Sequence, residues 1–130
     1  MDLEDVPTRV ERIRPRVLVV DDDDAIRVCI ERTLVRYGYL VAVAAGVEEA
    51  LGRARTWRPD VLLVDRRLRD GDGLELAGRV RAEFGPDAPR VLVCSGDGSL
   101  HGWRVVPKPF HLHELVEAVR SSLSVTASRG

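Results

Sequence analysis

The 130-residue sequence predicts an α/β fold built on a parallel β-sheet. Short apolar runs rich in valine and leucine end abruptly in polar residues, as strands buried on both faces of a parallel sheet do. Between these runs, apolar residues recur every three or four positions, which is the spacing of an amphipathic helix. With 45% hydrophobic and 32% charged residues, a chain of this length suits one globular domain.

The N-terminal half of the chain contains two predicted strand–helix pairs. Residues 1–15 are polar, show no period and are expected to form a flexible leader. Residues 17–20 (VLVV) predict the first strand, and apolar residues recur at helical spacing over 26–37. Residues 40–44 (LVAVA) predict the second strand, and residues 47–56 predict the helix that follows it.

The alternation of strands and helices continues in the C-terminal half. Residues 61–64 (VLLV) predict a third strand, and a turn rich in glycine and aspartate leads from it into a helix over 74–84. Residues 91–94 (VLVC) predict a fourth strand and residues 103–106 a shorter fifth one. The apolar spacing over 112–123 predicts a last amphipathic helix.

One connection is too short to hold a helix. Residues 95–102 (SGDGSLHG) contain three glycines and no helical period, whereas a helical crossover needs about 10–12 residues. We therefore expect a loop here, with Leu100 and Trp103 covering the sheet in place of a helix. The domain is expected to span residues 16–123, and residues 124–130 are expected to form a frayed tail.

Composition and charge exclude several classes of function. The chain has 20 basic and 21 acidic residues, so its net charge of −1 offers no general attraction to nucleic acid, and direct DNA binding is not expected. The apolar runs are far shorter than the roughly 20 residues that span a membrane, and no signal peptide is present, so a cytoplasmic protein without membrane contact is expected. Cys29 and Cys94 lack the spacing of metal or redox sites and are expected to be buried, reduced thiols.

Reactive polar side chains come at or just after the ends of the predicted strands. These residues are Asp21, Asp22, Asp65, Ser95 and Lys108. In open parallel sheets, ligands bind beyond the carboxyl ends of the strands, so we expect these side chains to meet at one edge of the sheet.

This set of side chains suits phosphoryl chemistry. Crowded carboxylates need a cation, and hard oxygen ligands open to water favour Mg²⁺. A metal ion and an ammonium group would neutralise charge on a phosphoryl group, which a carboxylate could attack to form an aspartyl phosphate. Lys108 is the only lysine of the chain, which suggests that a compact ammonium is required there, and Ser95 could donate to a phosphoryl oxygen.

Four segments, in this order, resemble response regulator receiver domains of two-component signalling. They are residues 17–27 (VLVVDDDDAIR), 61–76 (VLLVDRRLRDGDGLEL), 91–96 (VLVCSG) and 107–110 (PKPF). The resemblance covers residues 16–123. It implies a flavodoxin-like, doubly wound, parallel five-stranded sheet with strand order 2-1-3-4-5, in which the short loop replaces the family's fourth helix.

The resemblance also implies a phosphoacceptor and a Mg²⁺ site. By this likeness Asp65 is the phosphoacceptor and a metal ligand. Asp22 is a direct Mg²⁺ ligand, Asp21 is a ligand through water, and the backbone carbonyl of Arg67 is a further protein ligand.

Other parts of the family pattern are only partly present. Ser95 matches the switch hydroxyl and Lys108 matches the phosphoryl-binding lysine, with Pro109 following what is commonly a cis bond in the family. However, Arg69 stands where the family has a proline after the phosphoacceptor, and Val105 stands where it has the switch aromatic. We therefore expect output to differ from aromatic-rotamer switching.

The resemblance implies a function in a phosphorelay. Asp65 would receive a phosphoryl group from a sensor histidine kinase or a histidine phosphotransfer protein, with Mg²⁺. The chain would not be an enzyme, although it would assist its own phosphorylation and dephosphorylation. Because only one helix and a tail follow Lys108, we expect no output domain and action through contacts with an unidentified downstream protein. The sequence leaves a homodimer open.

Two other classes of function are alternatives to a phosphorelay receiver. In a pseudo-receiver, the fold would serve as an interaction module without phosphorylation; the missing helix and Val105 favour this, whereas the intact site residues oppose it. A small phosphohydrolase of the haloacid dehalogenase type would need an acid at position 67, where Arg67 stands. Asp23 and Asp24 are better explained as helix caps than as metal ligands.

Overall fold

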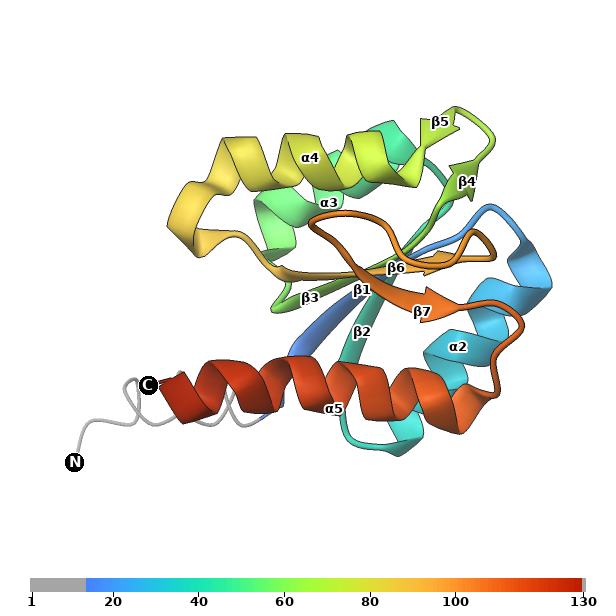
Figure 1. The fold of residues 1–130 in the computed structure, drawn as a ribbon, viewed down its shortest axis with the longest axis vertical. Helices are drawn as coiled ribbons and strands as arrows, with labels where there is room; N and C mark the ends of the chain where they lie inside the picture. Colours follow the sequence, from blue (N-terminus) through green and yellow to red (C-terminus); the bar gives the residue numbers. More distant parts are fainter. Residues whose placement is uncertain (1–13, 130) are drawn as a thin grey trace.

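The computed structural model of the chain describes residues 14–129 (Figure 1), so residues 1–13 of the predicted leader lie outside the described part. Five parallel strands form the central sheet in the order β2-β1-β3-β6-β7. Counted along the chain, this is the predicted flavodoxin-like order 2-1-3-4-5. The strands are β1 (Arg16–Val20), β2 (Leu40–Ala44), β3 (Val61–Asp65), β6 (Arg90–Ser95) and β7 (Arg104–Pro107).

Helices cover both faces of the sheet. They are α2 (Asp24–Arg36), α3 (Val47–Trp57), α4 (Gly73–Phe84) and α5 (Leu112–Arg129). Figure 1 shows α3 and α4 on one face and α2 and α5 on the other. Among the residues that the structure describes, no helix is both long enough and apolar enough to cross a membrane.

Alternate residues of each strand point to opposite faces, and this divides the core into two clusters. Leu18, Leu62 and Val93 pack with α3 and α4, whereas Val19, Leu63 and Leu92 pack with α2 and α5. Because both faces are covered, both sets of strand residues must be apolar, which explains the unbroken apolar runs in the sequence.

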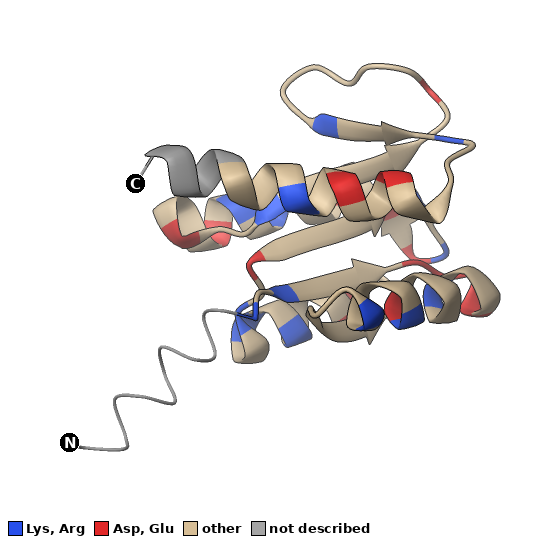
Figure 2. Ribbon diagram, turned by 90° about the horizontal axis from the view of Figure 1, so that it is seen from below, with Lys and Arg blue, Asp and Glu red and all other residues tan. Residues whose placement is uncertain are grey.

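Charged side chains cap and stabilise the helices. The Asp23 carboxylate caps α2 by accepting a hydrogen bond from the Ile26 N–H over 3.1 Å, and Asp72 caps α4 in the same way through Leu74 over 2.8 Å. In α5, Glu114 lies in the first turn, and Figure 2 shows the acidic residues of this helix towards its N-terminal end, where negative charge is favoured by the helix dipole. The prediction that an aspartate caps the first helix is therefore confirmed for Asp23.

The connection between β6 and β7 contains no helix, as predicted. Over residues 96–103 the backbone forms bends, turns and irregular structure. Leu100 and Trp103 pack against the core cluster on the α3 and α4 face. The Arg81 guanidinium lies 3.8 Å from the centre of the Trp103 ring. The loop therefore covers the part of the sheet that a fourth helix would cover.

The last helix is longer than the sequence predicts. The sequence places its end at residue 123 and a frayed tail over 124–130, whereas α5 continues to Arg129. Neither glycine nor proline occurs between Leu112 and Arg129, and each residue added to an existing helix gains a backbone hydrogen bond. The corrected helix thus runs six residues past the predicted end.

The two cysteines differ in exposure, which corrects one prediction. Cys94 is buried as predicted, but Cys29 is exposed. On α2 the buried positions are Ile30 and Leu34, which are four residues apart on one helix face. Cys29 lies beside that face and not on it.

We predict that this difference in exposure makes the two thiols differ in reactivity. Burial raises the pKa of the Cys94 thiol to about 12, so the reactive thiolate is scarce at neutral pH. Iodoacetamide should label the folded protein at Cys29 alone, and unfolding in urea should expose Cys94 to a second label. Peptide mapping by mass spectrometry identifies the sites, with Cys29→Ser as the control. Comparable labelling of Cys94 in the folded protein would contradict the structure.

Candidate functional site

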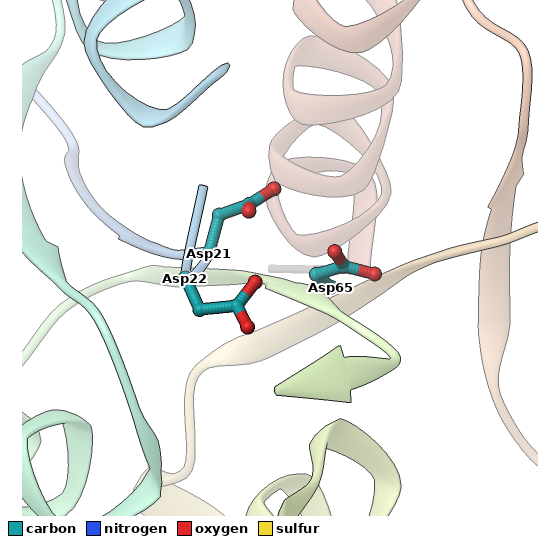
Figure 3. A group of neighbouring side chains, drawn as sticks. All are labelled: Asp21, Asp22 and Asp65. Atoms are coloured by element: carbon teal, nitrogen blue, oxygen red, sulfur yellow. The ribbon is translucent and has the colours of Figure 1, made fainter. Parts of the chain in front are cut away.

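Neighbouring strands β1 and β3 bring three aspartates together at the carboxyl edge of the sheet (Figure 3). One carboxylate oxygen from each of Asp21, Asp22 and Asp65 lies within 4.8 Å of the others. Asp21 is only 5% exposed, and the Asp65 side chain is 11% exposed. The structure thus places side by side the three carboxylates that the sequence predicts there.

The three carboxylates repel one another. Burial raises the pKa of the Asp21 carboxyl, and the charges of Asp65 and Asp22 raise it further. A hydrogen bond of 2.9 Å from the Asp23 N–H and the charge of Lys108 oppose this shift without cancelling it. A cluster of carboxylate oxygens that is short of positive charge and partly open to solvent fits a hard divalent cation such as Mg²⁺.

Lys108 supplies the positive charge nearest to Asp65. Its ammonium nitrogen lies 2.9 Å from Asp65 Oδ1. Burial alone would lower the pKa of this ammonium, but the hydrogen bond and the charge of Asp65 outweigh burial and raise it. The Lys108 N–H also donates to the Ser95 carbonyl over 2.9 Å, which ties the end of β6 to the segment after β7. The peptide bond between Lys108 and Pro109 is cis, as the resemblance implies.

Ser95 lies at the same edge of the sheet but makes a different contact. It ends β6 and is 3% exposed, and its neighbour Cys94 is the register partner of Asp65. The Ser95 Oγ accepts a hydrogen bond of 3.0 Å from the Asp97 N–H. The hydroxyl group thus lies on the strand next to Asp65.

A short antiparallel hairpin, β4 (Arg67–Leu68) and β5 (Gly71–Asp72), follows the phosphoacceptor candidate. The Arg67 N–H donates to Asp65 Oδ1 over 3.3 Å. The structure therefore places Arg67 beside the site through its backbone. The role of its carbonyl as a metal ligand stays a prediction.

The hairpin also caps a helix, which the sequence analysis missed. The Asp70 carboxylate accepts hydrogen bonds of 2.8 and 3.1 Å from the Val47 N–H at the start of α3, where Gly46 has no side chain to do so. These bonds lower the pKa of Asp70. A Cβ at position 46 would collide with the Asp70 carboxylate, so a larger residue there would displace the side chain that caps α3. Local spacing cannot reveal a cap supplied from 23 residues away.

A second feature missed in the sequence is an ion pair beside the phosphoacceptor candidate. The Arg66 guanidinium lies 2.7 Å from the Asp97 carboxylate. The Arg66 N–H donates to the Cys94 carbonyl over 3.0 Å, continuing the pairing between β3 and β6. The pair joins the end of β3 to the loop between β6 and β7.

Gly73 brings α4 close to the phosphoacceptor candidate. Its N–H donates to the Arg66 carbonyl over 2.6 Å. A Cβ at this position would overlap the backbone carbonyl oxygen of Asp65. The closeness of the two backbones therefore explains why glycine follows Asp72 in the sequence.

Comparison with known proteins identifies the family. The family model of the response regulator receiver domain matches residues 17–120. The chain belongs to this family. It is a receiver domain of two-component signalling.

Curated relatives are longer than this chain. The response regulator MprA of Mycobacterium avium (strain 104) is 36% identical over an alignment of 121 residues that covers 85% of this chain and 52% of that protein. The transcriptional regulatory protein AfsQ1 of Streptomyces coelicolor is 43% identical over 67 residues, which are 52% of this chain and 30% of that protein. The chain thus spans about half the length, or less, of these relatives.

Solved structures of receiver domains share the fold over most of the chain. The chemotaxis response regulator CheY4 of Vibrio cholerae aligns with a TM-score of 0.77 and 28% identity, over 84% of this chain and 98% of that one. A CheY-like receiver domain protein of Methanospirillum hungatei JF-1 aligns with a TM-score of 0.81 and 26% identity, over 90% and 99%. The receiver domain of the hybrid histidine kinase CckA aligns with a TM-score of 0.70 and 33% identity, over 83% and 98%.

We predict that the close contact at Gly73 is necessary for stability. Gly73→Ala should destabilise the fold by about 1–3 kcal/mol, because the methyl group meets backbone and not a movable side chain. Gly78→Ala is the matched control on the same helix, since a Cβ there meets nothing within 4 Å. The control should be neutral or gain about 0.5–1 kcal/mol from helix propensity. Urea denaturation measures both changes, and equal stability of the two variants would refute the contact.

Proposed function

We propose that this receiver domain accepts a phosphoryl group on Asp65. The donor is the phosphohistidine of a sensor histidine kinase or of a histidine phosphotransfer protein, and Mg²⁺ is the cofactor. The observation that carries this proposal is the 2.9 Å contact between Lys108 and an Asp65 carboxylate that also lies among the carboxylates of Asp21 and Asp22. A nucleophile, an ammonium and a metal ligand set thus share one edge of the sheet.

The contacts of Asp65 suggest which of its oxygens attacks. Lys108 and the Arg67 N–H both donate to Oδ1, and no residue that the structure describes donates to Oδ2. We assign the attack to Oδ2. The Oδ2–P bond forms as the P–N bond of the phosphohistidine breaks, and the electron pair of that bond returns to the imidazole nitrogen. The product is an aspartyl phosphate and a neutral histidine.

The neighbouring side chains would then hold the phosphoryl group. Lys108 would move its hydrogen bond from Asp65 to a phosphoryl oxygen, because formation of the acyl phosphate leaves Oδ1 as an uncharged carbonyl oxygen while the phosphoryl oxygens carry negative charge. The Ser95 hydroxyl would donate to a second oxygen from the adjacent strand. Each residue would thus stabilise negative charge that the phosphoryl group brings to the site.

The carboxylate set fits Mg²⁺ by the kind and number of its oxygen atoms. Asp22 and Asp65 would bind the ion directly, Asp21 through water, and Arg67 through its backbone carbonyl. When bound, Mg²⁺ neutralises charge on the carboxylates and on the phosphoryl oxygens. Burial raises the pKa of Asp21, and the charges of Asp65 and Asp22 raise it further, so a cation beside these carboxylates would offset part of that cost.

We further propose that the domain acts through contacts with another protein. A second candidate function is a pseudo-receiver, an interaction module that phosphorylation does not control. The observation that favours it is Val105 in β7, paired with Val93, where the family has its switch aromatic. Phosphorylation of Asp65 decides between the two candidates.

We predict one Mg²⁺-dependent phosphoryl adduct when the protein is incubated with acetyl phosphate. Intact-mass spectrometry should show this adduct in the wild type and lose it in Asp65→Asn or in EDTA. Lys108→Ala should slow its formation roughly 100-fold, as the loss of a charge-stabilising donor does. Asp87→Asn, on the exposed turn after α4, is the control and should react like the wild type.

Beryllofluoride binding is the second test, for the case in which acetyl phosphate is a poor phosphoryl donor. If the wild type forms no adduct and binds no beryllofluoride, the phosphoacceptor function is wrong and the pseudo-receiver function is favoured. If Asp65→Asn still forms the adduct, the phosphoacceptor is a different residue.

A further inference from the structure

The loop of residues 96–103 is tied at its start to the phosphorylation site. Asp97 makes two contacts with residues beside Asp65, one through its carboxylate and one through its backbone N–H. Its carboxylate lies 2.7 Å from the guanidinium of Arg66, the residue that follows Asp65. Its N–H donates to the Ser95 Oγ over 3.0 Å. The loop is therefore held by a cation and a hydroxyl that both flank the phosphoacceptor candidate.

At its other end the same loop is held by α4. Arg81 donates from Nη1 to the Gly102 carbonyl over 3.5 Å and places its guanidinium 3.8 Å from the centre of the Trp103 ring. Between these ends the backbone forms a turn hydrogen bond of 3.0 Å from Trp103 to Leu100. The position of the loop thus depends on contacts near its two ends, one of which involves Arg66.

The ion pair between Arg66 and Asp97 can be exchanged for a stronger one. Its side chains are 28% and 50% exposed, and an ion pair in contact with water contributes little to stability. A phosphoryl group carries about −1.5 to −2 charge and binds guanidinium more strongly than a single exposed carboxylate does. Arg66 directly follows Asp65 in the chain, so their Cα atoms are only about 3.8 Å apart, and the long, flexible arginine side chain starts close to the residue that would carry the phosphoryl group.

We propose that phosphorylation of Asp65 draws Arg66 away from Asp97 and releases the loop of residues 96–103. The phosphoryl group attracts the guanidinium and repels the Asp97 carboxylate, so both effects break the same ion pair. This inference rests on the proposed function of Asp65. It supplies a response that needs neither a fourth helix nor an aromatic at position 105.

Trp103 offers a readout at the far end of the loop. Its indole packs on the core and under Arg81, so release of the loop changes its surroundings. The other tryptophan, Trp57, lies at the end of α3 beside Arg16. Trp57→Phe therefore leaves Trp103 as the sole source of tryptophan emission and serves as the background for all variants.

The experiment compares variants with and without beryllofluoride, which mimics the phosphoryl group and is added together with Mg²⁺. In the parent, the ligand should shift Trp103 emission and speed amide hydrogen exchange of residues 96–103 roughly two- to fivefold, as expected for the loss of an exposed ion pair. Arg66→Ala and Asp97→Asn should show the faster exchange already without ligand and gain little on binding. Arg69→Ala removes a nearby exposed arginine that forms no ion pair with the residues that the structure describes, and this variant should respond like the parent.

Beryllofluoride binding and the response of the loop are measured by different methods, so the experiment distinguishes failure of the loop release from failure of the proposed phosphorylation of Asp65. Fluorine NMR reports whether beryllofluoride binds. If it binds to the parent but the loop does not respond, or if Arg66→Ala responds as fully as the parent, the release of the loop through Arg66 is overturned. If it does not bind and acetyl phosphate forms no adduct, the proposed function of Asp65 has failed, and the inference fails with it.

Discussion

The crowding of Asp21, Asp22 and Asp65 at one edge of the sheet is the constraint on which the rest of the site depends. Parallel pairing of β1 with β3 makes it unavoidable, because both strands run straight into aspartates at the same edge. Burial raises the pKa of the Asp21 carboxyl, and the neighbouring charges of Asp65 and Asp22 add to that shift. Lys108 offsets part of the negative charge, and a divalent cation would offset more.

The same crowding explains why so many elements converge on Asp65. Lys108 contacts its carboxylate from beyond β7, Arg67 from the hairpin, and Gly73 brings the start of α4 against its carbonyl. A change of charge at Asp65 therefore acts at once on contacts from several parts of the chain. Through Arg66 and Asp97 it also reaches the loop that replaces the family's fourth helix.

Sequence alone predicts the features that depend on local pattern. The strands are visible because burial on both faces requires unbroken apolar runs, and the site follows from what ends those runs, as Asp65 ends β3. Exposure at the margin of a helix face is harder to predict, and Cys29 is exposed where the sequence predicts a buried thiol. The Asp70 cap and the Arg66–Asp97 pair join residues 23 and 31 positions apart, and no local pattern specifies such partners.

The measurement that tests the account most directly is urea denaturation of the wild type and Asp22→Asn, each with and without Mg²⁺. Without Mg²⁺, Asp22→Asn should be the more stable protein, because it removes one of three mutually repelling carboxylates. Mg²⁺ should stabilise the wild type, since a ligand that binds only the folded state raises the free energy of unfolding, and it should stabilise the variant far less. A wild type that does not respond to Mg²⁺, or a variant that responds equally, would contradict a shared metal site at this edge.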